Sequence, residues 1–227
     1  IVGSVLLYRS SQQKKIANQL LALKSLRSQM NPHFIFNALN SVNSFIAKND
    51  ERAANKYLSD FSKLMRQVME NSKYDLVTLQ SEMDILGIYI QLEHFRFSDK
   101  FDFEFIIDDS IDTEDIEIPP MLVQPYIENA IWHGLRYRET KGFLTIALRA
   151  EDNFVEFVIT DNGIGRKKSQ ELKTKNQKET KSTGMKNIET RLNILNEVNK
   201  MALKVNVSNL DEVNKSGTII RIQIPIN

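Results

Sequence analysis

Apolar residues recur at three- and four-residue steps through the first part of the chain, a spacing typical of amphipathic helices. The pattern predicts a first helix over residues 14–47, a second over residues 51–71 and a third over residues 79–97. Pro32 interrupts the first helix, and a kink is expected there because proline removes a backbone hydrogen bond. Since the break between the first two helices is short, they should be antiparallel neighbours.

The rest of the chain mixes strand-like alternation with further helical stretches. Strands are expected at residues 101–107, 143–150, 154–160, 202–208 and 218–225, and helices at residues 121–134 and 184–197. Helices followed by mixed elements with hairpins predict an α+β fold. The expected architecture is an antiparallel helical hairpin followed by an α/β sandwich, and not a doubly wound parallel sheet.

Composition and charge exclude some classes of protein function. The 227 residues are 41% apolar and 26% charged, which is ordinary globular usage and enough for one large domain or two small ones. The absence of cysteine excludes thiolate catalysis, disulfides and cysteine-ligated zinc. Thirty basic residues against 29 acidic ones do not indicate a nucleic-acid-binding protein.

The chain opens with the apolar residues 1–8 and then a basic segment. A membrane span needs about 20 apolar residues, so this opening is too short to cross a bilayer. It fits the end of a transmembrane helix with its cytoplasmic flank, because basic residues favour the cytoplasmic side. The alternative is a frayed hydrophobic end without relation to a membrane.

Candidate chemistry begins on the first helix, where His33 directly follows Pro32 and Asn37 lies one turn later on the same face. An imidazole near neutral pH is a competent nucleophile and proton carrier. The alternative is a structural histidine. The chain holds no P-loop sequence and no His-Glu-x-x-His zinc pattern.

A second candidate is the Asp-Asn-Gly-Ile-Gly sequence of residues 161–165, which follows a predicted strand. Its glycines allow positive φ and close approach of a ligand, and a buried Asp161 can accept a hydrogen bond from an exocyclic amine. The alternative is an ordinary turn. Residues 166–183 carry seven bases against two acids and one aliphatic side chain, so this stretch should be a mobile loop without a ligand. Gly184 then opens a predicted helix, a setting that favours phosphate.

Four segments, in this order, resemble the nucleotide-binding motifs of the GHKL ATPase superfamily. They are Glu128-Asn129-Ala130 with His133-Gly134, residues 161–165, residues 183–187, and Gly217-Thr218. Upstream, residues 29–40 resemble the phosphoacceptor helix of LytS-type sensor histidine kinases, a family within that superfamily. The fold implied is a dimerising hairpin followed by a GHKL-type (Bergerat) ATP-binding sandwich.

The resemblance implies ATP and Mg²⁺ as cofactors and gives each matched position a role. His33 takes the γ-phosphoryl group, and Asn37 orients the imidazole or a water. Asn129 supplies an oxygen to Mg²⁺, and Glu128 helps to orient the metal or a water. The nucleotide is bound by His133, Asp161, Gly163, Gly165, Gly184 and Thr218. The general base stays unassigned, because Phe34 follows His33 where many histidine kinases have an acidic residue.

The resemblance also implies three segments and several partners. Residues 1–13 are the end of a transmembrane helix and a juxtamembrane segment. Residues 14–76 form the dimerisation and histidine phosphotransfer hairpin, and residues 77–227 form the catalytic ATP-binding domain. The expected partners are a second copy, a response regulator of LytTR type and the inner (cytoplasmic) membrane, with this region in the cytoplasm and without nucleic acid. Two alternatives are a GHKL ATPase that uses hydrolysis for conformational change and a degenerate kinase that serves as a dimeric signalling scaffold.

Overall fold

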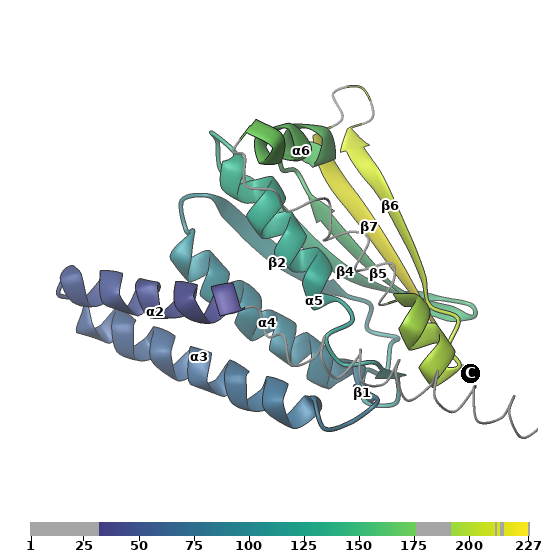
Figure 1. Cartoon of the computed structure of the whole chain (residues 1–227). Coiled ribbons are helices and arrows are strands. Elements are labelled where there is room, and N and C mark those ends of the chain that lie inside the picture. Colours follow the sequence, from purple (N-terminus) through teal and green to yellow (C-terminus); the bar gives the residue numbers. More distant parts are fainter. Residues whose placement is uncertain (1–31, 176–191, 212, 214–215, 227) are drawn as a thin grey trace, which may run out of the picture. The chain divides into compact units, whose positions relative to one another are not determined.

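The computed structural model describes residues 32–175, 192–211, 213 and 216–226 (Figure 1). Contacts group the chain into two compact units. One comprises residues 41–181 and 202–227, and the other comprises residues 1–40 and 182–201. The sheet and most of the predicted nucleotide-binding positions belong to the first of these units.

Three helices lie where the apolar spacing predicted them. They are α2 (Pro32–Ala47), α3 (Glu51–Asn71) and α4 (Leu79–Arg96). Asp50 caps α3 by accepting a hydrogen bond from the Ala53 N–H at 3.0 Å, and Thr78 caps α4 by accepting one from the Ser81 N–H at 3.2 Å. Residues 14–31 of the predicted first helix lie outside the described residues, so the kink at Pro32 stays a prediction.

None of the helices within the described part of the chain has the length and the apolar run that crossing a bilayer requires.

The main sheet has five strands in the order β2-β4-β5-β7-β6 (Figure 1). The strands are β2 (Phe101–Ile107), β4 (Gly142–Glu151), β5 (Phe154–Asp161), β6 (Lys204–Asp211) and β7 (Ser216–Pro225). The edge strand β2 pairs with β4 in parallel, and every other neighbouring pair is antiparallel. The α+β expectation is confirmed, and a doubly wound parallel sheet is excluded for this sheet.

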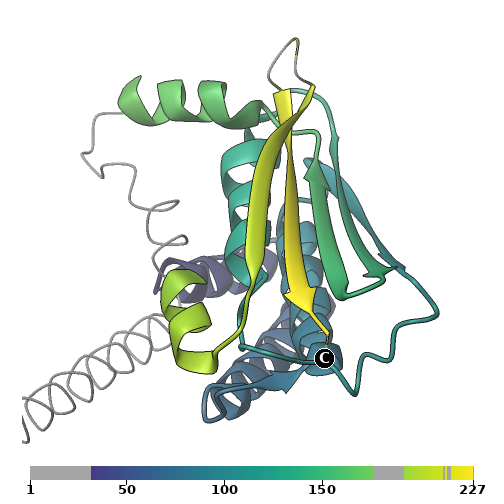
Figure 2. The ribbon, with the colours of Figure 1, turned by 90° about the vertical axis from the view of Figure 1, so that its right-hand side faces the viewer.

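One face of this sheet forms the core of the unit. Ile146, Ile159 and Ile220 lie in register across β4, β5 and β7, and all three are buried. Period-two alternation places these apolar side chains on one face. Helix α4 and α5 (Gln124–Asn129) lie on one side of the sheet (Figure 2). The two-layer arrangement therefore holds the helix of the predicted nucleotide site against the sheet.

The helix predicted over residues 121–134 differs from the expectation. Helix α5 begins only at Gln124, because Met121 has a positive φ of 59°. The chain then continues as a π-helix, η1 (Ala130–Gly134), and a 3₁₀ turn, η2 (Leu135–Tyr137). A small sheet of β1 (Val77–Thr78) and β3 (Glu117–Ile118) was not predicted.

The expectation of a loop over residues 166–183 is wrong for its first part, and the mobility of the stretch stays a prediction. Residues 165–175 form helix α6 (Gly165–Lys175). Both Nε and Nη2 of Arg166 donate to the Asn209 side chain on β6, at 3.3 and 3.0 Å, and Ser169 is buried. Contacts with distant strands thus stabilise a helix that its own apolar content does not. Residues 176–183 lie outside the described residues, and of the predicted helix 184–197 the structure describes residues 192–199, which are helical.

Candidate functional site

Asp161 is a buried carboxylate at the end of β5, with 2% of its surface exposed. Its Oδ1 accepts a hydrogen bond from the Gly163 N–H at 2.8 Å. Thr218, its register partner on β7, donates a second one from its side chain. Burial raises the pKa of Asp161 to about 6, and the two hydrogen bonds oppose that rise. The carboxyl group is therefore a strong acceptor in a dry setting, suited to a ligand that brings an N–H donor.

Gly163 and Gly134 form the close contact between the Asp161 loop and the end of η1. A Cβ added to Gly163 would lie 2.6 Å from Asp161 Oδ1 and 2.6 Å from the Gly134 backbone. The Ile164 N–H donates to the Gly134 carbonyl at 3.3 Å, and the Gly217 N–H donates to the Gly163 carbonyl at 2.9 Å. Backbone contacts thus join the helix, the loop and β7, and Gly163 is required for this packing.

Asn162 ties the same loop to β4. Its Oδ1 accepts from the Phe143 N–H at 2.8 Å, and its own N–H donates to the Phe143 carbonyl at 3.3 Å. Arg138 donates from its guanidinium to the Asn162 carbonyl. Gly165 then adopts a φ of 77°, which few other residues tolerate, where the chain turns into α6. The loop is therefore fixed on both sides of Asp161.

Three predicted site residues lie along one continuous helical segment. Glu128 and Asn129 end α5, His133 lies in η1, and all three are half-buried. Glu128 Oε1 accepts from Gln124 Nε2 at 2.9 Å. Isolated π-helical turns occur frequently at functional sites, and this one ends at Gly134, against the Asp161 loop. The structure thus brings Glu128, Asn129 and His133 onto the segment that contacts this loop.

Three predicted residues, His33, Asn37 and Gly184, lie in the other unit or outside the described residues. His33 lies in the first turn of α2. The structure describes the backbone at this position. Asn37 is buried one turn later on the same helix. Both belong to the unit of residues 1–40 and 182–201. Gly184 lies outside the described residues. The roles of His33, Asn37 and Gly184 stay predictions.

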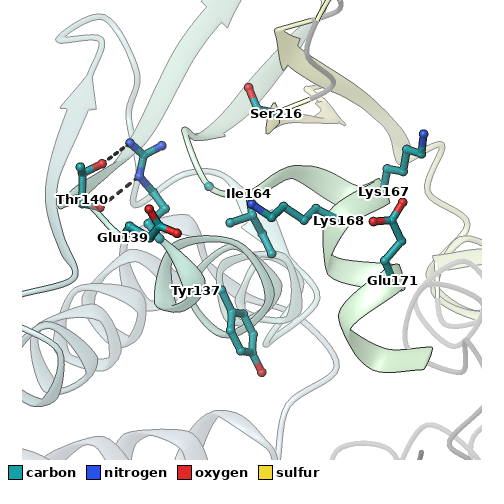
Figure 3. A pocket seen from close by; sticks show the side chains of 10 residues that line it. Tyr137, Glu139, Thr140, Ile164, Lys167, Lys168, Glu171 and Ser216 are labelled. Atoms are coloured by element: carbon teal, nitrogen blue, oxygen red, sulfur yellow. Dashed lines mark hydrogen bonds between the residues drawn. The ribbon is translucent and has the colours of Figure 1, made fainter. Parts of the chain in front are cut away.

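A cavity of 560 Å³ lies beside the loop (Figure 3). Its walls come from residues 137–140, from Gly163 and Ile164, from α6 and from Ser216. Lys167, Lys168 and Glu171 line it from α6. Of the predicted site residues that the structure describes, Gly163 alone is part of this lining. The sequence signalled the basic side chains through the charge of residues 166–183 but did not place Tyr137 beside them.

Glu82 is a buried residue that sequence reasoning missed. It is fully buried on α4, and its two carboxylate oxygens accept from the Met121 N–H at 2.8 Å and the Val123 N–H at 3.2 Å. These contacts hold the segment that leads into α5. The available signal was an acid among apolar positions of a predicted helix. Glu82 thus anchors the beginning of the helix that Asp161 and Gly163 contact at its end.

No group of three or more His, Asp or Glu side chains placed to hold a metal occurs within the described ranges.

Comparisons with known proteins agree on histidine kinases. A family model for histidine kinases matches residues 21–101. The chain is similar to the sensor protein LytS of Oceanobacillus iheyensis, with 35% identity over 156 residues that cover 69% of this chain and 26% of that protein. It is similar to the sensor histidine kinase YpdA of Escherichia coli, with 34% identity over 157 residues that cover 69% and 27%.

Among solved structures, the chain is similar to the histidine kinase domain from the Erythrobacter litoralis EL346 blue-light activated histidine kinase. The matched region covers 95% of this chain and 94% of that one, with 14% sequence identity and a TM-score of 0.47. The chain spans only 26% and 27% of the length of the two curated relatives named above.

Proposed function

Because the chain belongs to the histidine kinase family, with a region of the LytS type, we propose that it uses ATP to phosphorylate its own histidine and passes the phosphoryl group to a response regulator. The observation that carries the proposal is the buried acceptor carboxylate of Asp161 beside the segment of Glu128 and Asn129. An adenine ring presents an exocyclic amine, and a dry carboxylate selects such a donor strongly.

The nucleotide pocket is proposed to be built around that carboxylate. Asp161 accepts from the adenine amino group, and Thr218 holds the carboxylate in place from β7. His133 lies toward the phosphate chain on the adjoining η1 turn. Gly165 and Gly184 let the following segment approach the phosphates. The lysines of α6 supply positive charge beside the loop.

Magnesium fits the residues present only as an ion that arrives with the nucleotide. Mg²⁺ usually keeps several waters and takes one or two protein ligands plus substrate phosphates, and the described residues hold no cluster of three acidic or histidine side chains for a metal. We propose the Asn129 side-chain oxygen as its protein ligand, with Glu128 orienting the metal or a water. The ion, when bound, neutralises charge on the phosphates.

In the proposed reaction, an imidazole nitrogen of His33 attacks the γ-phosphorus. The nitrogen–phosphorus bond forms while the bond from the γ-phosphorus to the bridging oxygen breaks, so ADP leaves and the imidazole loses a proton. Asn37, one helical turn on, orients the imidazole. In the transfer, an acceptor oxygen of the regulator forms a bond to the phosphorus while the nitrogen–phosphorus bond breaks, and the imidazole regains a proton. Such chemistry depends mainly on positioning and charge neutralisation.

The assembly is proposed to be a homodimer that pairs through the hairpin of residues 14–76, with residues 77–227 as the catalytic domain. Large apolar side chains are exposed on both described hairpin helices. They are Phe36, Leu39 and Ile46 on α2, and Leu58 and Met69 on α3. A bundle with a second copy would bury such side chains.

Similarity to LytS supports a LytTR-type regulator, and the apolar residues 1–8 support an anchor in the inner membrane with this region in the cytoplasm.

The test is incubation with γ-labelled ATP, followed by acid and base treatment of the protein. The chain should become labelled, and the label should be acid-labile and base-stable, as a phosphoramidate is. His33→Gln should abolish labelling and leave nucleotide binding near normal. His94→Gln, which changes a half-buried histidine that contacts Asp102 at 3.2 Å, should keep the label. Phosphorylation that survives in His33→Gln would overturn the assignment. Release of phosphate without labelling would indicate an ATPase, and neither activity would indicate a scaffold.

A further inference from the structure

Trp132 is the single tryptophan of the chain and lies in η1, three residues after Asn129. Two guanidinium groups lie close to its ring, Arg96 at 4.8 Å and Arg136 at 4.9 Å from the ring centroid. Phe97 meets the same ring edge-on, with 5.4 Å between centroids. Arginine favours such aromatic faces. Trp132 is therefore contacted by the last residue of α4, Arg96, and by the residue that follows it, Phe97.

Glu93, one turn before Arg96 on α4, is the buried carboxyl group of this cluster. It is 1% exposed, and its carboxylate accepts a hydrogen bond from the Trp132 side chain. Arg96 and Arg136 attract it, whereas Glu128 repels it. Burial, more than any of these neighbours, raises the pKa of Glu93 to about 7.

Two further groups complete the surroundings of Glu93. Tyr89 of α4 is fully buried and is hydrogen-bonded to Trp132. Tyr57 of α3 interacts electrostatically with both Glu93 and Arg96 and is hydrogen-bonded to Ser41 of α2. Tyr57 of α3 thus interacts electrostatically with the same two α4 side chains that lie against Trp132.

Packing alone does not explain the cluster. Among the described residues, Glu93 Oε2 and Arg96 Nη1 are buried without a hydrogen-bond partner. Buried polar atoms of this kind are costly, and apolar residues of similar volume usually serve a core at least as well as buried charges. Their presence directly behind the segment of Glu128 and Asn129 indicates that the two charges serve this segment.

We propose that Glu93 and Arg96 are positioning residues of the nucleotide site, which hold Trp132 and so fix the helical segment that carries Glu128 and Asn129. The inference rests on the proposed function, because it assigns a role toward that site. The negative charge of Glu128 raises the pKa of Glu93, and Glu128 accepts a hydrogen bond from Gln124 on its own helix. Because Tyr57 faces the same pair, a displacement of α3 changes the support of Trp132.

The single tryptophan makes the inference testable without turnover. Emission of Trp132 and binding of a non-hydrolysable ATP analogue, by calorimetry with Mg²⁺, are measured on the whole chain. The variants are Glu93→Gln, Arg96→Met and Arg96→Lys, with folding checked by circular dichroism. Asp84→Asn, an exposed carboxylate of the same helix, is the matched control.

Glu93→Gln and Arg96→Met should shift Trp132 emission in the absence of nucleotide and weaken analogue binding by about 10-fold, the lower end of what loss of a supporting partner costs. Arg96→Lys should recover part of the affinity, and Asp84→Asn should change neither quantity. If Glu93→Gln does not fold, Arg96→Met decides.

Three results would overturn the inference or its premise. Folded variants with wild-type affinity would overturn the inference. Weaker binding with unchanged emission would also overturn it, because the effect would not pass through Trp132. A wild-type chain that does not bind the analogue would instead overturn the proposed function.

Discussion

Two buried carboxylates hold opposite ends of the helical segment of the site, and they differ in what they bind. Glu82, fully buried, gives both oxygens to backbone N–H groups before α5. Asp161, 2% exposed, accepts from one backbone N–H and from the Thr218 side chain beyond the other end. Burial is the same in both. The difference teaches that the donors around a carboxylate, and not its burial, separate an anchor of the main chain from an acceptor suited to a ligand.

The largest effect should come from removing the anchor. Glu82→Ala leaves the buried Val123 N–H and the partly buried Met121 N–H without their acceptor, and a buried donor without an acceptor costs about 1–3 kcal/mol. The free energy of unfolding in urea should therefore fall by about 2–6 kcal/mol. Asp84→Ala, on the exposed face of the same helix, should change it little. A loss below about 1 kcal/mol for Glu82→Ala would mean that the segment before α5 does not depend on this carboxylate.

The second effect is a pH dependence that belongs to Asp161. Its pKa is raised from an ordinary 3.8 to about 6, so between these values the native state binds more protons than the unfolded state. The free energy of unfolding therefore falls as pH rises through this window, by about 3 kcal/mol at most. Asp161→Asn should reduce the slope of the profile, measured by urea unfolding from pH 4 to pH 6. Glu93, whose pKa is raised from 4.5 to about 7, keeps its own contribution of the same sign in the variant. The prediction would be contradicted if the free energy of unfolding of the wild type rose between pH 4 and pH 6 while that of Asp161→Asn did not.

The third effect separates binding from stability. Asp161→Asn replaces an acceptor by a group that is partly a donor, and a lost hydrogen bond to a charged group is worth about 1.5–3 kcal/mol. Affinity for an ATP analogue should fall by roughly 10- to 150-fold, while stability at pH 7 should not decrease. Calorimetry measures the affinity, and Asp152→Asn in the exposed β4–β5 turn is the control. Equal affinities for wild type and Asp161→Asn would place the adenine elsewhere.

The smallest effects concern two glycines that differ in surroundings. Gly163→Ala would force a Cβ to within 2.6 Å of Asp161 and Gly134, which should cost about 1–3 kcal/mol of stability. Gly87→Ala in α4, where a Cβ would meet nothing within 4 Å, should add about 0.5–1 kcal/mol. Thermal unfolding of both variants measures these opposite signs. A stabilised Gly163→Ala would show that the loop and η1 can separate freely.

Local patterns were sufficient to predict most of the fold. Apolar periodicity placed α3 and α4, and alternation placed β2, β4 and β5. The elements that were predicted wrongly depend on contacts with residues far away in the sequence. Helix α5 starts late because of Met121, which Glu82 contacts from 39 residues away, and α6 is stabilised by Asn209, 43 residues from Arg166. No periodic signal exists for such contacts, or for a two-residue strand such as β1.

The candidate site shows the same division. The order of the motifs identified Glu128, Asn129, Asp161 and Thr218, which the structure places around η1 and the adjoining loop. The residues behind them, Glu93 and Arg96, carry no motif, because their surroundings come from four separate elements. A charge in a predicted helix acquires a role only when the fold supplies its neighbours.

The single parallel pair of the sheet has a consequence for cooperativity. Strand β4 meets β5 through a two-residue turn, whereas β2 meets β4 only after residues 108–141 have crossed between them, and this crossover contains Glu128 and Asn129. Closing so long a loop costs entropy that the β2–β4 hydrogen bonds must offset. We therefore expect β2 and α5 to open together as one cooperative unit, so that their amides exchange at similar rates. The amides of the β4–β5 hairpin should stay protected during this opening. A bound nucleotide would then slow exchange at the edge strand β2, which carries none of the proposed site residues.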